Sequence, residues 1–338
     1  MNRRGFLRLS TGSVLSTITA ACSGKRKGTI IVDTRSSDTH KMVPVILDTD
    51  IGSDIDDTWA LAMMLKSPEL DVRLITTDTG DTTYRARLTA RLLEVAGRTD
   101  IPVGIGIPRP DAPSPQAPWV EGYALSDYPG TVYEDGVSAL VDTIMSSSEP
   151  ATLVCIGPVP NIQAALEREP RIAERARFIG MHGSIRRGYD GSKTIAAEYN
   201  VAQDPQACRA AFSAPWGVTI TPLDTCGIVK LEGEKYLAVR DCEDALIQAL
   251  IENYRIWTQN SAWTGGLDPE KESSILFDTV AIYLAFSEEL LVMEKLGIRV
   301  TDDGYTVIDD AAKGINCSTG WKNLPAFEDF LVQRLTGC

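Results

Sequence analysis

From residue 43 onward, short apolar segments alternate with longer segments in which apolar residues recur with a helical period. VPVIL at 43–47 predicts a strand, and TWALAMMLKS at 58–67 predicts a helix. The same alternation predicts further strands at 72–77, 101–106, 151–157, 177–181 and 218–221, and further helices at 82–97, 161–169, 204–213, 243–262 and 325–335. Strands separated by helices indicate a mostly parallel sheet with helices on both faces. We therefore expect one large α/β domain over residues 43–338.

Polar or small residues stand at the ends of four of the predicted strands. The first strand runs into an aspartate-rich segment, and the others end at Thr79-Gly80-Asp81, Gly157-Pro158 and Met181-His182-Gly183. Ligands of open α/β sheets bind outside the carboxyl ends of the strands. The four segments therefore predict one shared cleft.

The aspartate-rich segment is ILDTDIGSDIDDTWAL at 46–61. It holds five aspartates within ten residues, namely Asp48, Asp50, Asp54, Asp56 and Asp57. Carboxylates at this density repel one another and lose hydration energy when they are buried. Hard oxygen ligands suit a hard cation such as Ca²⁺ or Mg²⁺. The segment therefore predicts a divalent cation among the aspartates.

Other interpretations of this segment fit its residues less well. An EF-hand is excluded, because its loop needs Asp or Asn where Gly52 stands and Gly where Ser53 stands. A phosphatase motif of the haloacid dehalogenase type matches Asp48-Thr49-Asp50 but expects Thr or Val at the position of Gly52. A solvated acidic turn at the start of the 58–67 helix is the third interpretation. On the motif alone, the phosphatase and the acidic turn stay open.

Composition and charge narrow the class of protein. The formal net charge of the 338-residue chain is −13, which argues against nucleic acid or an anionic membrane surface as the main partner. The seven cysteines include no CxxC pair and no cysteine beside a ligand-like histidine, so a zinc site is not expected. The cysteines after Cys22 are expected to be mostly buried free thiols.

The first 22 residues resemble an export signal. Arg3 and Arg4 precede a mildly apolar stretch at 12–21, which is typical of a twin-arginine signal and is too short to span a bilayer permanently. TAAC at 19–22 resembles a lipoprotein cleavage box with Cys22 as the lipid-anchored residue, without the usual leucine. We expect an exported periplasmic or cell-envelope lipoprotein with a flexible tether at 23–42. Ordinary signal cleavage and a cytosolic tail are the alternatives.

The ordered motifs of the chain resemble one enzyme family. DTDIGSDIDDTWAL at 48–61 is similar to the N-terminal signature of the inosine–uridine-preferring nucleoside hydrolases. Further matches follow in family order: Thr79-Gly80-Asp81, 152–172, MHGS at 181–184, AAEYNVAQDPQA at 196–207, VTITPLD at 218–224 and FDTVAIYLAF at 277–286. The resemblance runs from about residue 43 to the C-terminal helix. It implies a nucleoside hydrolase-like fold with a Rossmann-like core, a small-molecule nucleoside substrate such as a purine nucleoside, and a homo-oligomer, either dimer or tetramer.

The resemblance also implies a reaction and a set of site residues. It implies hydrolysis of the N-glycosidic bond of a ribonucleoside or related ribosylated compound, with Ca²⁺ holding the ribose 2′- and 3′-hydroxyls and a water. Asp50 matches a metal ligand that is also the general base on that water. The other matched metal ligands are Asp57, Asp278 and the backbone carbonyl of Ile156. The matched substrate-binding residues are Asp56, Asp81, Met181, Glu198 and Asn200.

The chain departs from the family pattern at three places. Asp54-Ile55 is a two-residue extension, and Asp81 stands where many members have Asn. Phe277 stands where the inosine–uridine type has the histidine that protonates the leaving base. His182 is expected to be structural. The base preference therefore does not follow from the sequence.

The missing histidine leaves two questions at the level of the sequence. Aromatic stacking is an alternative way to activate the leaving base, with Trp119, Tyr254, Trp257 and Trp263 as candidates. A nucleoside-binding lipoprotein with little turnover is the alternative function. The intact set of metal-binding positions favours the hydrolase.

Overall fold

The computed structural model describes residues 41–109 and 113–337. The predicted export signal, the lipidation at Cys22 and nearly all of the predicted tether lie outside the described residues. Within the described ranges, no helix has both the length and the apolar character that crossing a membrane requires.

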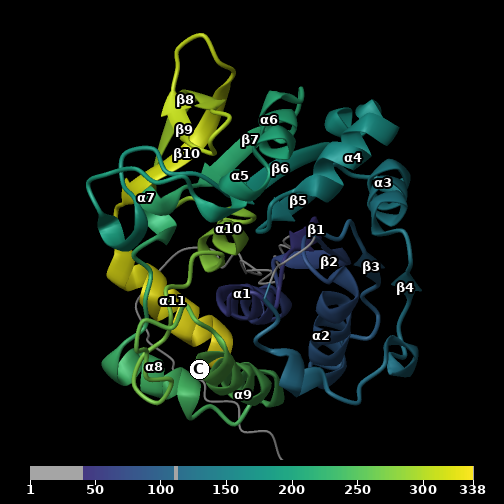
Figure 1. Cartoon of the computed structure of the whole chain (residues 1–338), viewed down its shortest axis with the longest axis vertical. Coiled ribbons are helices and arrows are strands. Elements are labelled where there is room, and N and C mark those ends of the chain that lie inside the picture. Colours follow the sequence, from purple (N-terminus) through teal and green to yellow (C-terminus); the bar gives the residue numbers. More distant parts are fainter. Residues whose placement is uncertain (1–40, 110–112, 338) are drawn as a thin grey trace, which may run out of the picture. The chain divides into compact units, whose positions relative to one another are not determined.

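Strands and helices alternate along the described chain (Figure 1). The strands are β1 (Val43–Thr49), β2 (Leu70–Thr77), β3 (Val103–Ile105), β4 (Val132–Tyr133), β5 (Ala151–Cys155), β6 (Ala176–Met181), β7 (Val218–Thr221), β8 (Leu291–Val300), β9 (Thr306–Ile308) and β10 (Gly314–Trp321). The α-helices are α1 (Asp56–Leu65), α2 (Thr82–Val95), α3 (Gly136–Ser146), α4 (Pro160–Arg168), α5 (Tyr199–Gln203), α6 (Pro205–Ser213), α7 (Leu223–Cys226), α8 (Gly233–Arg240), α9 (Ala245–Asn260), α10 (Thr279–Leu284) and α11 (Leu324–Thr336).

The strands form one sheet in the order β4-β3-β2-β1-β5-β6-β7-β10-β8-β9. The pairings from β4 to β10 are parallel, and β8 pairs antiparallel with both β10 and β9. The predicted mostly parallel α/β sheet is confirmed. The direction in which the chain adds strands reverses between β1 and β5, and such a switch point is where open α/β sheets bind ligands.

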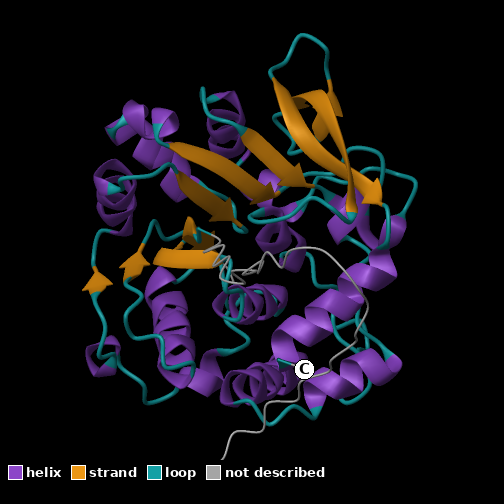
Figure 2. Ribbon diagram, turned by 180° about the vertical axis from the view of Figure 1, so that it is seen from behind, coloured by secondary structure: helices purple, strands orange, loops and turns teal. Residues whose placement is uncertain are grey.

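Side chains alternate along the central strands and enter two hydrophobic cores. Val45 and Leu47 of β1 pack in the core that contains α1, α2 and α9, whereas Ile46 packs in the core that contains α3, α4 and α6. Figures 1 and 2 show these two groups of helices on opposite faces of the sheet. Both faces are covered, which explains why the strands are nearly continuous apolar segments.

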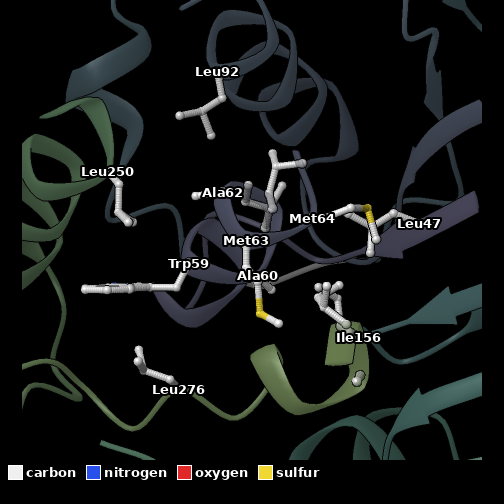
Figure 3. Close-up of a cluster of buried hydrophobic side chains, with 14 of the residues drawn as sticks. Leu47, Trp59, Ala60, Ala62, Met63, Met64, Leu92, Ile156, Leu250 and Leu276 are labelled. Atoms are coloured by element: carbon white, nitrogen blue, oxygen red, sulfur yellow. The ribbon is translucent and has the colours of Figure 1, made fainter. Parts of the chain in front are cut away.

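Helix α1 is enclosed on all sides, since it contacts β2, α9, α10 and α11. Figure 3 shows Trp59 of α1 extending between Leu250 and Leu276, and Met64 lying beside Leu47 on the opposite side. A helix without a solvent-exposed face is apolar all round, as its sequence shows. This burial fixes the first turn of α1, which carries Asp56 and Asp57.

The structure also contains elements beyond those that the hydrophobic pattern predicts. These are the helices α3, α5, α7, α8 and α10 and the strands β4, β8, β9 and β10. Helix α3 begins at an Asp135 cap whose side chain accepts from the Ser138 amide. The hairpin strand β8 is only partly buried, and its sequence LVMEKLGIRV does not alternate regularly between apolar and polar residues. Of the described cysteines, four are buried and Cys242 is half-buried, all as free thiols, as predicted.

Candidate active site

A pocket of about 360 Å³ lies at the carboxyl ends of β1, β5 and β6. Eight of the nine predicted site residues line it: Asp50, Asp56, Asp57, Ile156, Met181, Glu198, Asn200 and Asp278. The remaining lining residues are Ser53, Asp54, Tyr189, Tyr199, Trp263 and Phe277. The predicted cleft is therefore present at three of the four strand ends, whereas residues 79–81 after β2 are not part of its lining.

The structure places the ninth residue, Asp81, elsewhere. Asp81 is the N-cap of α2, where its side chain accepts a 2.9 Å hydrogen bond from the Tyr84 amide, and it is solvent-exposed. The family resemblance implied that Asp81 binds the substrate, but in the structure Asp81 caps a helix instead. The carboxylate at the end of β2 that lies close to the site is Asp78, which the sequence analysis did not identify.

Three buried carboxylates meet at the floor of the pocket. One carboxylate oxygen each from Asp56, Asp57 and Asp278 lies within 4.8 Å of the others. Asp56 and Asp57 open α1, and Asp278 is the residue before α10, where it makes no capping hydrogen bond. Desolvation raises the pKa of each of the three carboxyl groups well above its usual value, and repulsion between neighbouring carboxylates adds to this effect.

The hydrogen-bond donors present do not neutralise this group. The Thr49 hydroxyl donates to Asp57 over 2.5 Å, and the structure gives Asp56 and Asp278 no side-chain donor other than each other among the described residues. Three such carboxylates, with the Ile156 carbonyl in the same pocket lining, form an all-oxygen donor set that suits a hard cation. The residues present therefore fit a metal ion, with Asp56 at a position that the family alignment gave to substrate binding.

Asp50 has a positive neighbour of its own. The guanidinium of Arg85 is fully buried and donates to the carbonyls of Thr79 and Ile51 and to the Ser53 hydroxyl. It stands 4.0 Å from the Asp50 carboxylate. Burial raises the pKa of Asp50, and the Arg85 charge opposes this rise. The sequence analysis did not identify Arg85, because nothing in the α2 pattern distinguishes it from the half-buried Arg87 and Arg91 of that helix.

Asn200 and Glu198 are held in fixed orientations at one wall of the pocket. The Asn200 amide nitrogen donates to the carbonyls of Ile156 and Met181, both over 3.0 Å. Its side-chain oxygen is therefore the atom left to accept from a ligand hydroxyl. Glu198 caps α5 and accepts from the backbone amides of Gly183, Asn200 and Val201. Desolvation raises the pKa of Glu198 to about 7, although these amides oppose the rise.

A second pair of carboxylates lies behind the pocket, and we call Asp48 and Asp78 the inner pair. Asp48 accepts from the Thr76 hydroxyl over 2.5 Å and from the Asn161 amide over 2.7 Å. One oxygen of each carboxyl group, Asp48 Oδ2 and Asp78 Oδ1, has no donor among the described residues, and the two side chains are in hydrogen-bonding contact. Desolvation and the Asp48 charge raise the pKa of Asp78 well above its usual value. We infer that Asp78 is protonated and donates to Asp48.

Aromatic side chains form the mouth of the pocket. Tyr199 and Trp263 have ring centroids 6.3 Å apart, and Tyr189 and Phe277 have theirs 6.0 Å apart. Trp263 is the stacking candidate that the structure places at the pocket, where it is half-exposed. Tyr189 and Tyr199 were missed, because they lie in or beside a loop and have no periodic pattern.

The other stacking candidates are buried away from the pocket. Trp119 donates to Glu252, Tyr254 donates to the Glu272 carbonyl, and Trp257 donates to the Ser53 carbonyl. The hydrogen bond from Trp257 holds the backbone of the aspartate-rich segment in place at Ser53.

His182 does not reach the pocket. The ring is completely buried, its Nε2 lies 3.1 Å from the Gly157 carbonyl oxygen, and it packs against Phe178 and Phe212. Burial lowers its pKa to about 4, so it is neutral at physiological pH. The structural role expected for His182 agrees with this position, and His182 is not positioned to protonate a leaving group.

Comparison with known proteins identifies relatives along most of the chain. A model of the inosine–uridine-preferring nucleoside hydrolases matches residues 45–334. The pyrimidine-specific ribonucleoside hydrolase RihA of Escherichia coli O127:H6 is 29% identical over 237 residues, which cover 65% of this chain and 74% of that protein.

Solved structures agree with this match. A plant nucleoside hydrolase, the PpNRh1 enzyme, has a TM-score of 0.75 at 21% identity and covers 88% of this chain and 100% of its own. A purine-preferring ribonucleoside hydrolase from Gardnerella vaginalis has a TM-score of 0.69 at 22% identity, over 87% of this chain and 98% of its own. At these identities the structural likeness establishes the fold alone. The family model covers most of the chain, and the chain therefore belongs to the inosine–uridine-preferring nucleoside hydrolase family, whose members are metal-dependent hydrolases of N-glycosyl bonds.

Proposed function

We propose that this pocket hydrolyses the N-glycosidic bond of a ribonucleoside or related ribosylated compound and that its cation is Ca²⁺. The observation that carries the proposal is the convergence of Asp56, Asp57 and Asp278 at the floor, below the aromatic mouth. The floor supplies oxygen ligands and negative charge, and the mouth supplies flat apolar surface for a base. Family membership removes the haloacid dehalogenase interpretation of Asp48-Thr49-Asp50.

The donor set favours calcium over magnesium. Ca²⁺ accepts six to eight oxygen ligands in flexible geometry, including backbone carbonyls, whereas Mg²⁺ requires near-octahedral geometry and keeps several waters. Asp56, Asp57, Asp278 and the Ile156 carbonyl would hold the ion, with Asp50 beside them. When bound, the ion supplies a site for sugar hydroxyls and acidifies a water.

Asp50 is the residue best placed to take the proton of that water. Arg85 and the Ser53 hydroxyl stabilise its carboxylate form, so that it is available as a base. As the water oxygen bonds to the sugar C1′, the bond from C1′ to the base nitrogen breaks, and its electron pair goes to the base. The sugar gains positive charge in this process, and the surrounding carboxylates stabilise that charge.

The neighbouring residues orient the sugar. The Asn200 side-chain oxygen is free to accept from a ribose hydroxyl, because its amide nitrogen is held by two carbonyls. Met181 provides an apolar contact beside it. Interactions that tighten as the ring flattens lower the barrier more than they improve ground-state binding.

A panel of nucleosides tests this proposal. Purified protein should release reducing sugar from at least one ribonucleoside when Ca²⁺ is present, and a chelator should abolish the release. Restoring Ca²⁺ should restore it more fully than Mg²⁺ does. Absence of sugar release from every purine, pyrimidine and pyridine riboside, with Ca²⁺ present, would overturn the proposed activity.

We also propose that the protein is exported and anchored through its N-terminus. The support is the Arg3-Arg4 pair, the apolar stretch at 12–21 and the box that ends at Cys22. A reporter fused to residues 1–42 should cross the membrane only when both arginines are present. Cys22→Ala should release the reporter from the membrane fraction. A cytosolic reporter with both arginines intact would contradict export.

A further inference from the structure

The charges that line the pocket are all of one sign. Its ionisable acidic residues are Asp50, Asp54, Asp56, Asp57, Glu198 and Asp278. Among the described residues, no lysine, arginine or histidine is part of the lining. A divalent cation at the floor offsets the charge of Asp56, Asp57 and Asp278 in large part, but Asp54 lies outside that group. The pocket therefore keeps a negative potential above the floor.

Asp54 adds a carboxylate that the floor does not use. Its Oδ1 accepts from the Ile55 amide over 2.6 Å, and the described residues give its Oδ2 no partner. The side chain is half-buried and lines the pocket. The loop that carries it is fixed from two sides, because Gln116 donates to the Asp54 carbonyl and Trp257 donates to the Ser53 carbonyl, both over 3.1 Å. The carboxylate is therefore held in position before any ligand arrives.

The aromatic mouth offers poor proton donors to a leaving base. Phe277 and Trp263 carry no acidic proton, so the acidic protons at the mouth are those of the Tyr189 and Tyr199 hydroxyls, of which Tyr189 also accepts from the Tyr199 amide over 3.0 Å. Burial raises the pKa of Tyr189 above its usual value and that of Tyr199 to about 12. A neutral base that leaves as an anion would therefore receive little help from these side chains.

We propose that the preferred substrates are N-ribosides whose base carries a permanent positive charge, such as ribosyl-pyridinium compounds. This proposal rests on the proposed function and names its substrate class. When the C1′–N bond of such a compound breaks, the electron pair neutralises the base, which leaves without a proton. Water supplies the new C1′–O bond, and the proton it loses passes to Asp50 and then to solvent. One cationic nucleoside and one water thus give neutral base, ribose and one proton.

Recognition of the cation would come from the mouth. A flat cationic ring against Trp263 or Tyr199 gains a cation–π attraction. The free oxygen of Asp54 adds Coulomb attraction that a neutral base does not receive. Both contributions distinguish a charged base from an uncharged one of the same shape.

The test compares kcat/KM for nicotinamide riboside with kcat/KM for its uncharged 1,4-dihydro form, uridine and inosine, all with Ca²⁺ present. We expect at least a tenfold preference for the cationic riboside over each neutral compound. Equal or better turnover of uridine or inosine would overturn the inference while leaving the proposed function intact. No turnover of any of the four would instead count against the proposed function.

Two variants then test whether Asp54 and Trp263 cause the preference for the cationic riboside. Asp54→Asn and Trp263→Leu should each reduce the ratio of kcat/KM for the cationic riboside to that for uridine by about tenfold, mainly through KM. Asp142→Asn, an exposed charge-matched change on α3, is the control and should leave the ratio unchanged. Calorimetric binding of nicotinamide riboside to Asp50→Asn protein, with and without Asp54→Asn, measures the same preference without turnover. If Asp54→Asn instead removes activity on uridine selectively, Asp54 is a leaving-group acid, and the inference is wrong.

Discussion

Two groups of buried carboxylates lie at the same end of the sheet, and they are neutralised in different ways. The inner pair, Asp48 and Asp78, receives hydrogen bonds from the protein itself, through Thr76, Asn161 and the Val159 amide, and its two side chains contact each other. Among the floor carboxylates, Asp57 accepts from the Thr49 hydroxyl, and the described residues give Asp56 and Asp278 no side-chain donor other than each other. The contrast teaches that the density of carboxylates does not by itself indicate a metal site. The shortage of donors around the floor carboxylates indicates one.

The protein accepts backbone strain around the inner pair. Thr79 and Val159 have positive φ angles of 55° and 62°, although neither is glycine. Val159 in this conformation directs its amide at Asp78 over 3.2 Å. Non-glycine residues in the left-handed region cost of order 1–3 kcal/mol each. The fold therefore tolerates strained backbone that supplies hydrogen bonds to the inner pair, whereas the floor carboxylates remain available to bind a cation.

The largest expected effect concerns Asp50, which lies between the two groups and has Arg85 as its own positive partner. Asp50→Asn should lower kcat by roughly 10²- to 10⁴-fold, because the amide cannot accept the proton of the water. Steady-state sugar release measures this, and circular dichroism melting should show a folded protein. Activity within a few-fold of the parent would mean that the base lies elsewhere.

The second-largest effect should come from removal of the cation, which should depend on the floor carboxylates and not on the inner pair. Chelation should lower the free energy of unfolding by about 2.7 kcal/mol relative to protein with Ca²⁺ at 100 times its Kd, because only the folded state assembles the floor. Thermal melts with and without chelator measure the shift. Asp278→Asn should reduce the shift strongly, whereas Asp48→Asn should keep it. A shift of equal size in both variants would contradict the assignment of the floor carboxylates as ligands.

Two matched substitutions should change the free energy of unfolding in opposite directions, which compares the two groups directly. In chelated protein, Asp278→Asn should raise the free energy of unfolding by about 1 kcal/mol, since it removes one of three repelling carboxylates. Asp48→Asn should lower it by about 1–3 kcal/mol, since its donors Thr76 and Asn161 lose a carboxylate acceptor. Urea unfolding of both variants measures the difference. If both substitutions shift stability in the same direction, the two groups are not neutralised differently.

The smallest expected effect tests the shared proton. Asp78→Asn should change the free energy of unfolding by less than about 1 kcal/mol, because the amide can donate to Asp48 in place of the carboxyl proton. Asp78→Ala removes that donor and should cost about 1–3 kcal/mol. Equal costs for the two variants would show that Asp78 does not act as a donor.

The sequence predicted most of the fold, because local patterns are sufficient where elements are strongly periodic. Alternating apolar strands and amphipathic helices identified the strands β1, β2, β3, β5, β6 and β7 and the helices α1, α2, α4, α6, α9 and α11. The weaker hairpin of β8, β9 and β10 did not give a clear pattern, since its strands are only half-buried. Eight of nine site residues reached the pocket because they lie in motifs at strand ends or helix starts.

The sequence by itself determined which reactive groups are available: carboxylates at the end of a buried strand, a distant Asp278, and phenylalanine in place of histidine immediately before it. Tertiary structure alone decided which carboxylates face a ligand. Asp48 and Asp50 are two residues apart, yet Asn161 and Thr76 donate to the first, and Arg85 stands beside the second. The physical reason is that the state of a buried carboxylate depends on the donors around it, and these come from segments that only the fold brings together.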